Sequence, residues 1–275
     1  MYLPDSFYNR CDIKIPSSLI LDMDNKYDLP VYITLCLAYT PFCKEPFSVK
    51  RVLELSRMFR SIAARNKSMM EIAASLIRLR NLGYVQITYC NGIPIEQDVT
   101  KSRFLFRFIK NEIHGGYLSI RAMECDMVLD AIRMIPASEC KCSLCTLLHT
   151  YCLFRLNSYF WQNSYADKYA AWVGGISEIY KPLGITQKSL SEAVRAMREH
   201  NIITVCYGSV QSGEEELRAK TIVIFNIAVT DENIVDVIAK VKRRYNISEK
   251  ANGSWYPPNS TVANSASNGV INKVQ

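Results

Sequence analysis

The sequence has few histidines, few glycines and no long apolar run among its 275 residues. Its three histidines form no His-Glu-x-x-His motif, and its 11 glycines build neither a phosphate-cradling loop nor a nucleophile elbow. Gly174-Gly175 lacks the third glycine and the preceding strand of a dinucleotide-binding turn. We therefore expect a protein that is not an enzyme and needs no cofactor.

No segment reaches the roughly 18 to 20 apolar residues that a membrane-spanning helix requires. Residues 1–10 contain Pro4, Asp5 and Asn9 instead of the basic and then apolar order of a signal peptide. We therefore expect a cytoplasmic protein without a membrane partner, in which the ten cysteines are free thiols.

Hydrophobic residues make up 49% of the chain and charged residues 21%, as in ordinary globular proteins. The net charge of +7 is concentrated in residues 44–80, which carry nine basic and three acidic residues. A second basic run lies at residues 240–244. Such charge attracts phosphate or acidic surfaces, although a solvated helix face has the same composition.

The apolar period predicts three helices and then a hairpin in the first part of the chain. Helices are predicted over 28–40, after Ser48 and after Ser68, where Glu71 completes a capping box and Gly83 ends the helix. The period then changes to two, which predicts strands over 84–89 and 104–108 around an Asn91-Gly92 turn.

The same order returns in the second part. Helices are predicted over 137–160, over 176–181 and after Thr186, followed by strands over 202–207 and 220–225 and a helix over 231–244. The third helices align at an offset of 118 residues, and each half opens with a short strand-like segment, at 13–15 and 118–120. We interpret this as an internal duplication. The expected fold is mainly α with small β-hairpins (α+β), with domains at 1–112 and 113–244 and a disordered tail at 245–275.

Residues 176–203 combine a short helix, a turn at Gly184, a cap at Thr186 and a second amphipathic helix. These are the requirements of a helix-turn-helix. The segment resembles the winged helix-turn-helix family, with Gly184-Ile185-Thr186 at the turn and Asn201-Ile202-Ile203 at the start of the wing. Pro182 departs from that pattern, because it removes a backbone donor and shortens or bends the first helix. The resemblance implies two winged-helix domains in tandem.

The face opposite the apolar stripe of that second helix is predicted to read bases in double-stranded DNA, through Gln187, Lys188, Ser191 and Arg195. Lys181, Thr186 and Ser189 near the helix start are expected to contact phosphate. Glu192 lies among them and either accepts from cytosine or repels phosphate. The alternative is an exposed polar face that binds nothing.

The aligned positions of the first copy are Met69, Met70, Ala73 and Ile77, which offer no base-reading donors. We expect this face to be buried, for example in a homodimer formed through the first domain. Backbone phosphate is then expected to be contacted by the basic residues of this half: Lys50, Arg51, Arg57, Arg60 and Lys67. The tip of its hairpin, with Glu96 and Asp98, is poorly suited to DNA.

This division of roles resembles the tandem winged-helix replication initiators of plasmids, and the segment 13–19 followed by a helix looks like the start of DnaD-like replisome organisers. The resemblance implies sequence-specific DNA binding in replication initiation on a plasmid, phage or other mobile element, with replisome proteins as partners. A transcriptional regulator of the same architecture, and a protein-interaction module that uses winged helices for docking, stay open.

The densest group of metal-binding residue types is Cys140, Cys142, Cys145, His149 and Cys152. If one helix covers residues 137–160, the last four are spread over about 15 Å at 1.5 Å per residue, and one metal ion cannot collect them. On that assumption we expect a buried helix face and no metal site. A loop near Cys140 would change this conclusion.

Overall fold

The computed structural model describes residues 12–38, 46–56, 65–95, 99–100, 103–109, 116–160, 170–212, 216–228, 234–244 and 247–248. Within these ranges the chain forms nine helices and nine strands. The strands make two two-stranded sheets and one of five strands, all antiparallel. The fold is mixed α+β with small antiparallel sheets, as the sequence predicts.

The elements of the first half are β1 (Asp12–Pro16), α2 (Ser17–Leu21), α3 (Asp28–Ala38), α4 (Val49–Ser56), α5 (Arg65–Asn81), β2 (Val85–Tyr89) and β3 (Phe104–Phe108). The predicted cap of α4 is confirmed, because the amide of Arg51 donates to Ser48 Oγ at 3.2 Å. The predicted capping box of α5 is wrong. Ser68 is buried inside that helix, which begins three residues earlier, at Arg65.

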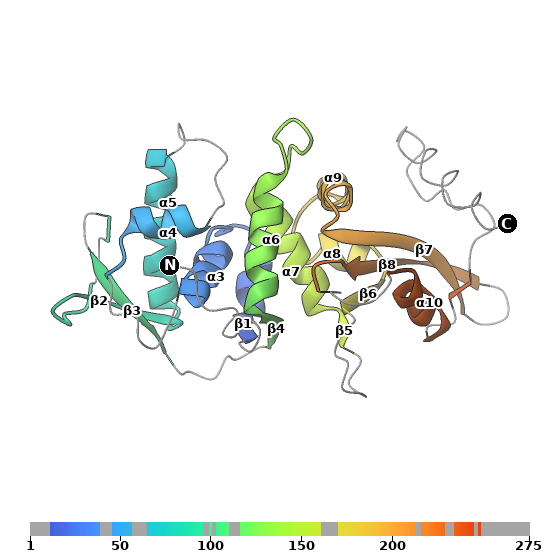
Figure 1. Cartoon of the computed structure of the whole chain (residues 1–275), viewed down its shortest axis with the longest axis horizontal. Helices are drawn as coiled ribbons and strands as arrows, with labels where there is room; N and C mark the ends of the chain where they lie inside the picture. The colour runs from blue at the N-terminus through green and yellow to red at the C-terminus, as the bar shows by residue number, and fades with distance from the viewer. Residues whose placement is uncertain are drawn as a thin grey trace.

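The elements of the second half are β4 (Tyr117–Arg121), α6 (Ala122–Met134), α7 (Leu144–Leu156), β5 (Tyr159–Phe160), β6 (Ala170–Gly174), α8 (Ser177–Tyr180), α9 (Gln187–Glu199), β7 (Ile203–Ser212), β8 (Glu216–Phe225), α10 (Ile234–Arg244) and β9 (Ile247–Ser248). α4, α5, β2 and β3 lie at one end of the long axis of the molecule, β1, β4, α6 and α7 in the middle, and β7, β8 and α10 toward the other end (Figure 1).

The helix predicted over 137–160 is confirmed only over Leu144–Leu156, as α7, and is wrong at both ends. Residues 135–143, which include Pro136, connect α6 to α7. α7 begins after Ser143, whose side chain accepts from the amide of Thr146 at 3.0 Å.

The C-terminal ends of α5 and α9 have the same geometry at the predicted offset of 118 residues. A residue with positive φ follows each helix, Gly83 at 76° and Asn201 at 56°. The next amide then donates to the carbonyl five residues back, at 3.0 and 2.8 Å. β2 and β7 both begin two residues after this turn. This repeated geometry supports an internal duplication.

The strands that open the two halves pair with each other. β1 and β4 run antiparallel, with Ile13 opposite Ile120 and Ile15 opposite Leu118. All four side chains are buried in a hydrophobic cluster that continues through the helices of both halves. The halves are therefore joined by backbone hydrogen bonds and by a shared core.

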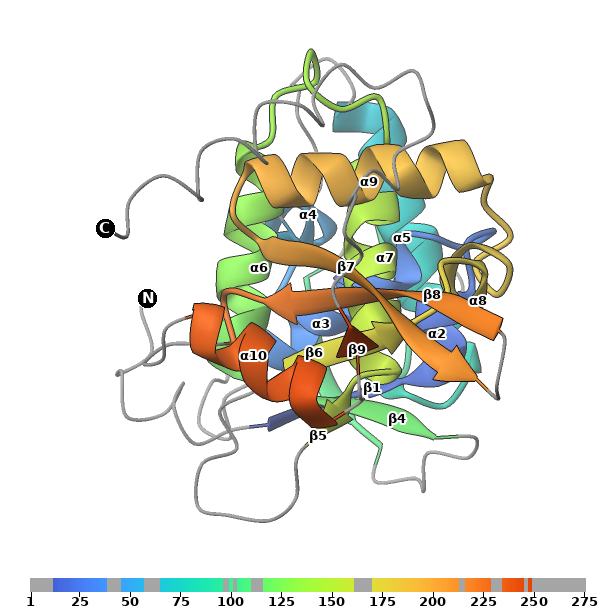
Figure 2. The ribbon, with the colours of Figure 1, turned by 90° about the vertical axis from the view of Figure 1, so that its right-hand side faces the viewer.

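The five-stranded sheet has the order β5-β6-β8-β7-β9. α10 crosses the sheet, and Val237 and Val241 of this helix pack against Ile222 and Ile224 of β8 (Figure 2). Ile247 joins the same cluster and places β9 beside β7. The predicted start of the disordered tail at residue 245 is therefore wrong for residues 247–248, while 249–275 lie outside the described residues.

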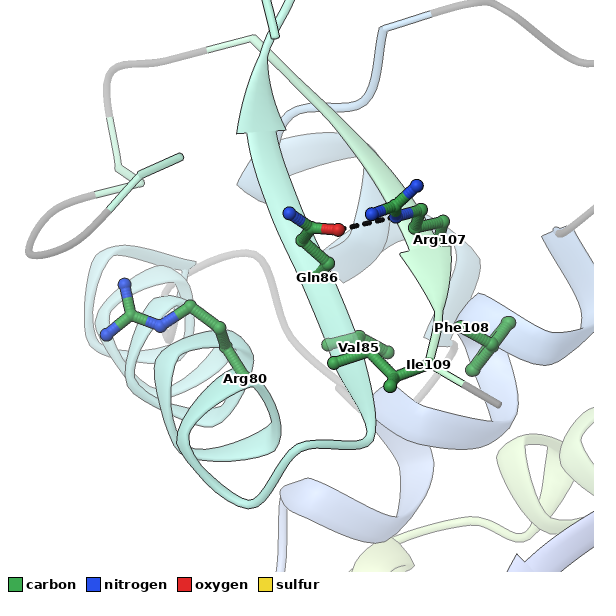
Figure 3. Close-up of a pocket in the computed structure, with 6 residues that line it drawn as sticks. All are labelled: Arg80, Val85, Gln86, Arg107, Phe108 and Ile109. Carbon is green, nitrogen blue, oxygen red and sulfur yellow. Dashed lines mark hydrogen bonds between the residues drawn. The ribbon is translucent and has the colours of Figure 1, made fainter. Parts of the chain in front are cut away.

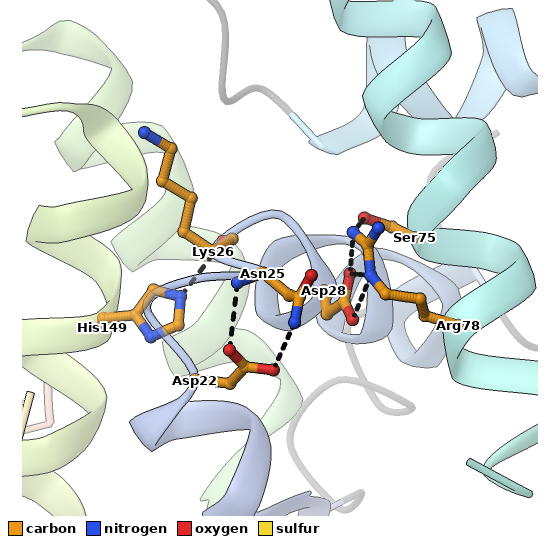
Figure 4. A network of polar contacts seen from close by, with 7 residues as sticks. All are labelled: Asp22, Asn25, Lys26, Asp28, Ser75, Arg78 and His149. Atoms are coloured by element: carbon orange, nitrogen blue, oxygen red, sulfur yellow. Dashed lines mark hydrogen bonds and ion pairs between the residues drawn. The ribbon is translucent and has the colours of Figure 1, made fainter. Parts of the chain in front are cut away.

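Polar contacts also fix the helices around α3 (Figure 4). Arg78 of α5 donates to both carboxylate oxygens of Asp28 at 2.7 to 3.1 Å, and Asp28 is 1% exposed. His149 of α7 lies between two carbonyl oxygens of the first half, with Nδ1 2.7 Å from Ile20 and Nε2 3.1 Å from Lys26. This contact connects the second half to the turn before α3.

Burial lowers the pKa of His149 below its ordinary value of 6.5, against the opposing effect of the two carbonyls. In acid the unfolded chain therefore binds a proton before the folded chain does. We expect the free energy of unfolding to fall as the pH drops below about 6.5, by at most about 1.4 kcal/mol per pH unit from this group. Denaturant titrations at several pH values from 7.5 to 5 should show that the free energy of unfolding changes less with pH in His149→Gln than in the original protein. An equal change in the two proteins would contradict this prediction.

Candidate nucleic-acid interface

α8, a turn and α9 form the unit for which the sequence predicts a DNA-reading role. α8 ends at Tyr180, before Pro182, in agreement with the shortening expected from that proline. Gly184 has φ 64°, a conformation that favours glycine, and redirects the chain into α9. The predicted cap is confirmed, because Thr186 Oγ1 accepts from the amide of Ser189 at 3.1 Å.

One face of α9 is anchored in the core. Leu190, Ala193, Ala196 and Met197 are fully buried, while Val194 is half-buried and packs against the same cluster. The apolar stripe predicted from the sequence therefore faces inward. The opposite face of α9 lies at the surface of the molecule, along its upper edge in Figure 2.

Most of the predicted DNA-contacting residues of this half are exposed. Gln187, Lys188 and Ser191 are exposed on the outward face of α9. Near the helix start, Lys181 and Thr186 are exposed and Ser189 is half-buried. This surface carries an amide, an ammonium and hydroxyl groups, a combination that can donate to base edges and phosphate oxygens.

Arg195 differs from these residues because it contacts another part of the chain. Its guanidinium donates to the carbonyl oxygen of Glu139 at 2.8 Å and lies 3.3 Å from the Glu199 carboxylate. His200 Nε2 lies 2.8 Å from the Glu139 carboxylate. Arg195 is therefore at the border of the exposed face, with part of its guanidinium already bound within the protein.

The segment 135–143, here called the α6–α7 loop, is the neighbour of α9 that the sequence prediction missed. Its backbone amide at Lys141 donates to Glu192 Oε1 at 2.5 Å, and the Cys142 thiol lies 3.4 Å from the carbonyl oxygen of Ser189. Glu192 is therefore engaged inside the protein and does not lie free among the base-reading positions. Pro136 and the good N-cap residue Ser143 were the sequence signals for this loop.

A long β-ribbon follows α9 directly. β7 and β8 pair over ten residues each, from Ile203 opposite Phe225 to Ser212 opposite Glu216. The strands are longer than predicted, because residues 208–212 and 216–219 extend the ladder where a loop was expected. The ribbon forms the inner strands of the five-stranded sheet, and β7 starts below α9 and runs away from it (Figure 2).

Some of the residues predicted to contact phosphate in the first half are exposed. Lys50 and Arg51 are exposed at the start of α4, and Lys67 is exposed in the first turn of α5. That end of α5 and the helix α9 both lie at the top of the molecule in Figures 1 and 2. Arg57, Arg60, Glu96 and Asp98 lie outside the described residues.

The four apolar residues predicted for the outer face of α5 were expected to be buried, and three of them are covered by the protein's own core. Ala73 is buried, and Met69 and Ile77 are partly buried against that core. Met70 is largely exposed, at 70%. A homodimer through the first domain stays a prediction.

A cleft of about 610 Å³ lies beside the first ribbon, which β2 and β3 form. It is lined by Arg80, Val85, Gln86, Arg107, Phe108 and Ile109 (Figure 3). Arg107 donates to Gln86, and Arg80 donates to Asn81 at 2.7 Å and to the carbonyl of Ile95. The two guanidinium groups point to different sides of β2 in Figure 3. The two arginines therefore do not point their donors at one place in the cleft where an anion could bind.

Comparisons with protein-family models, with curated proteins and with solved structures found no match. Among the described residues, no helix combines the length and the apolar character needed to cross a membrane.

Proposed function

We propose that this protein binds double-stranded DNA as a tandem winged-helix protein, with α9 in the major groove and the β7–β8 ribbon as its wing. The observation that carries the proposal is the surface of α9. This helix is anchored by a fully buried face, while Gln187, Lys188 and Ser191 are exposed on the other. A helix held in this way, preceded by a glycine turn and followed by a ribbon, is the arrangement that presents side chains to base edges.

The first half supplies contacts to the DNA backbone in this proposal. The exposed cations of this half include Lys50, Arg51 and Lys67, which have no role in the core. Residues 44–80, in which they lie, carry most of the net positive charge of the chain. Lysines and arginines at such positions neutralise phosphates without reading sequence. We propose the same contacts to the DNA backbone for Arg57 and Arg60.

Replication initiation on a plasmid, phage or other mobile element is the biological role that we propose, with replisome proteins as further partners. The support is the repeated helix end of α5 and α9 together with their different surfaces, since α9 exposes Gln187, Lys188 and Ser191 while the first half exposes Lys50, Arg51 and Lys67. A transcriptional regulator would use the same parts. A protected region over several direct repeats would favour initiation, whereas a single palindrome would favour regulation.

The test is selection of bound DNA from a random pool, followed by affinity measurements at two salt concentrations. We expect Gln187→Ala and Arg195→Ala each to reduce the preference for the selected site over unrelated DNA by about 5- to 150-fold, as for one base contact. We expect Lys50→Ala and Arg51→Ala to weaken binding to all sequences alike. Each should reduce the slope of log affinity against log salt by about 0.9.

Arg121→Ala is the matched control, since Arg121 is an exposed arginine at the end of β4. β4 lies at the bottom of the molecule in Figures 1 and 2, opposite α9. This variant loses the same charge and should retain the affinity, the preference and the salt slope. If no DNA binds at low salt, the protein is instead a docking module. An effect of Arg121→Ala equal to that of the α9 variants would also overturn the proposal.

A further inference from the structure

The α6–α7 loop brings two cysteines to the side of α9. The ligand atoms of Cys140, Cys142 and Glu192 all lie within 4.8 Å of one another. Cys140 is buried, at 1% exposure, whereas Cys142 and Glu192 are half-buried. The helix that was expected to separate the cysteines begins only at Leu144. Cys140 and Cys142 therefore do not lie on a helix that spreads them apart, so the reason for expecting no metal site does not hold for these two residues.

Two thiolates and one carboxylate form a ligand set that suits Zn²⁺. With Zn–S bonds of about 2.3 Å and Zn–O bonds of about 2.0 to 2.2 Å, tetrahedral ligand atoms are separated by about 3.5 to 3.8 Å. Ligand atoms already within 4.8 Å of one another need only small side-chain rotations to reach this separation. The fourth position of the tetrahedron would be open to water.

Backbone contacts hold the site in place on both sides. The amide of Lys141, between the two cysteines, donates to Glu192 Oε1 at 2.5 Å. Arg195 donates to the carbonyl oxygen of Glu139, the residue before Cys140, at 2.8 Å. The loop is therefore fixed against α9 before any ion binds, and this lowers the conformational cost of closing around one.

We propose that Cys140, Cys142 and Glu192 bind one Zn²⁺ ion, which fastens the α6–α7 loop to α9. Binding releases the two thiol protons to solvent, and neither sulfur is oxidised. The site tightens as the pH rises, because the ion competes with protons for the sulfurs. The ion would act as a structural clamp on the flank of α9, beside its outward face. This inference is independent of DNA binding.

The experiment is a titration of the full-length, reduced, metal-free protein with Co²⁺, followed by displacement with Zn²⁺. We expect a thiolate-to-Co²⁺ charge-transfer band that saturates at one equivalent and disappears when Zn²⁺ is added. Cys140→Ser and Cys142→Ser should each lose the band. Glu192→Gln should retain a thiolate band and weaken binding by at least about tenfold, the effect of losing one ligand.

Cys90→Ser is the matched control, because Cys90 is an exposed thiol next to the first ribbon. This variant should bind Co²⁺ like the original protein, and far-ultraviolet circular dichroism shows whether each variant is folded. The proposal fails if the reduced protein gives no thiolate band. It also fails if folded Cys140→Ser and Cys142→Ser keep the band.

Discussion

Replacing Arg155 by Met should lower the free energy of unfolding by about 3 to 5 kcal/mol, the cost of leaving one charge of a buried ion pair without its partner. Arg155 of α7 is 3% exposed, and its guanidinium lies 2.7 Å and 2.9 Å from the two carboxylate oxygens of Glu124 in α6. Tyr151 also donates to Glu124, at 2.7 Å. Methionine fills the space but cannot neutralise the carboxylate.

Glu124 is 5% exposed, so water cannot replace the lost guanidinium. Denaturant titration at pH 7 measures the effect, and Arg133→Met is the matched control, because Arg133 is an exposed arginine on α6. That control should change the free energy of unfolding by less than about 0.5 kcal/mol. The double variant Glu124→Leu with Arg155→Met removes both charges and should regain part of the lost stability, because the buried Tyr151 hydroxyl still loses its acceptor. A double variant as unstable as Arg155→Met alone would contradict the proposed cause.

Replacing Arg78 by Met should destabilise the first half by about 2 to 4 kcal/mol, since it leaves the carboxylate of Asp28 buried without its cation. The expected loss is smaller than for Arg155 because the Arg78 side chain is 32% exposed, so part of the pair is already hydrated. Asp28 also opens α3, where the helix dipole favours a negative charge.

Asp28→Asn in the Arg78→Met background separates charge from packing. The amide has nearly the same shape as the carboxylate but carries no charge, so it should restore at least half of the lost free energy of unfolding. Denaturant titration of the two variants measures this recovery. If asparagine brings no recovery, the role of Arg78 lies in packing and hydrogen bonding to Ser75, which its Nη2 contacts at 3.0 Å.

Elements with a clear period and a terminal signal could be predicted from the sequence. The repeat of Ile72, Leu76 and Leu79 gives the buried face of α5, and Thr186 gives the start of α9. The helix predicted over 137–160 started too early, because the true cap is Ser143 and the residues before it form the α6–α7 loop. α6 was missed although Cys125, Leu129 and Ile132 repeat at helical spacing and are buried.

The exposed face of α9 followed from its helical period, whereas the contacts on its flank did not. Glu139 and Arg195 are 56 residues apart in the sequence, and Lys141 and Glu192 are 51 apart. No local pattern indicates such contacts, because they depend on how the α6–α7 loop packs against α9. The grouping of Cys140 and Cys142 with Glu192 was hidden for the same reason.

The antiparallel contact between β1 and β4 limits how the two halves can move. Separating them as independent units would break a five-residue ladder and expose Ile13, Ile15, Leu118 and Ile120 to water. The spacing between the start of α5 and the helix α9 is therefore built into the fold and is not set by a flexible tether. If the protein binds DNA as proposed, a duplex that touches both must present its contacts at one separation and one helical phase, which the fold would fix.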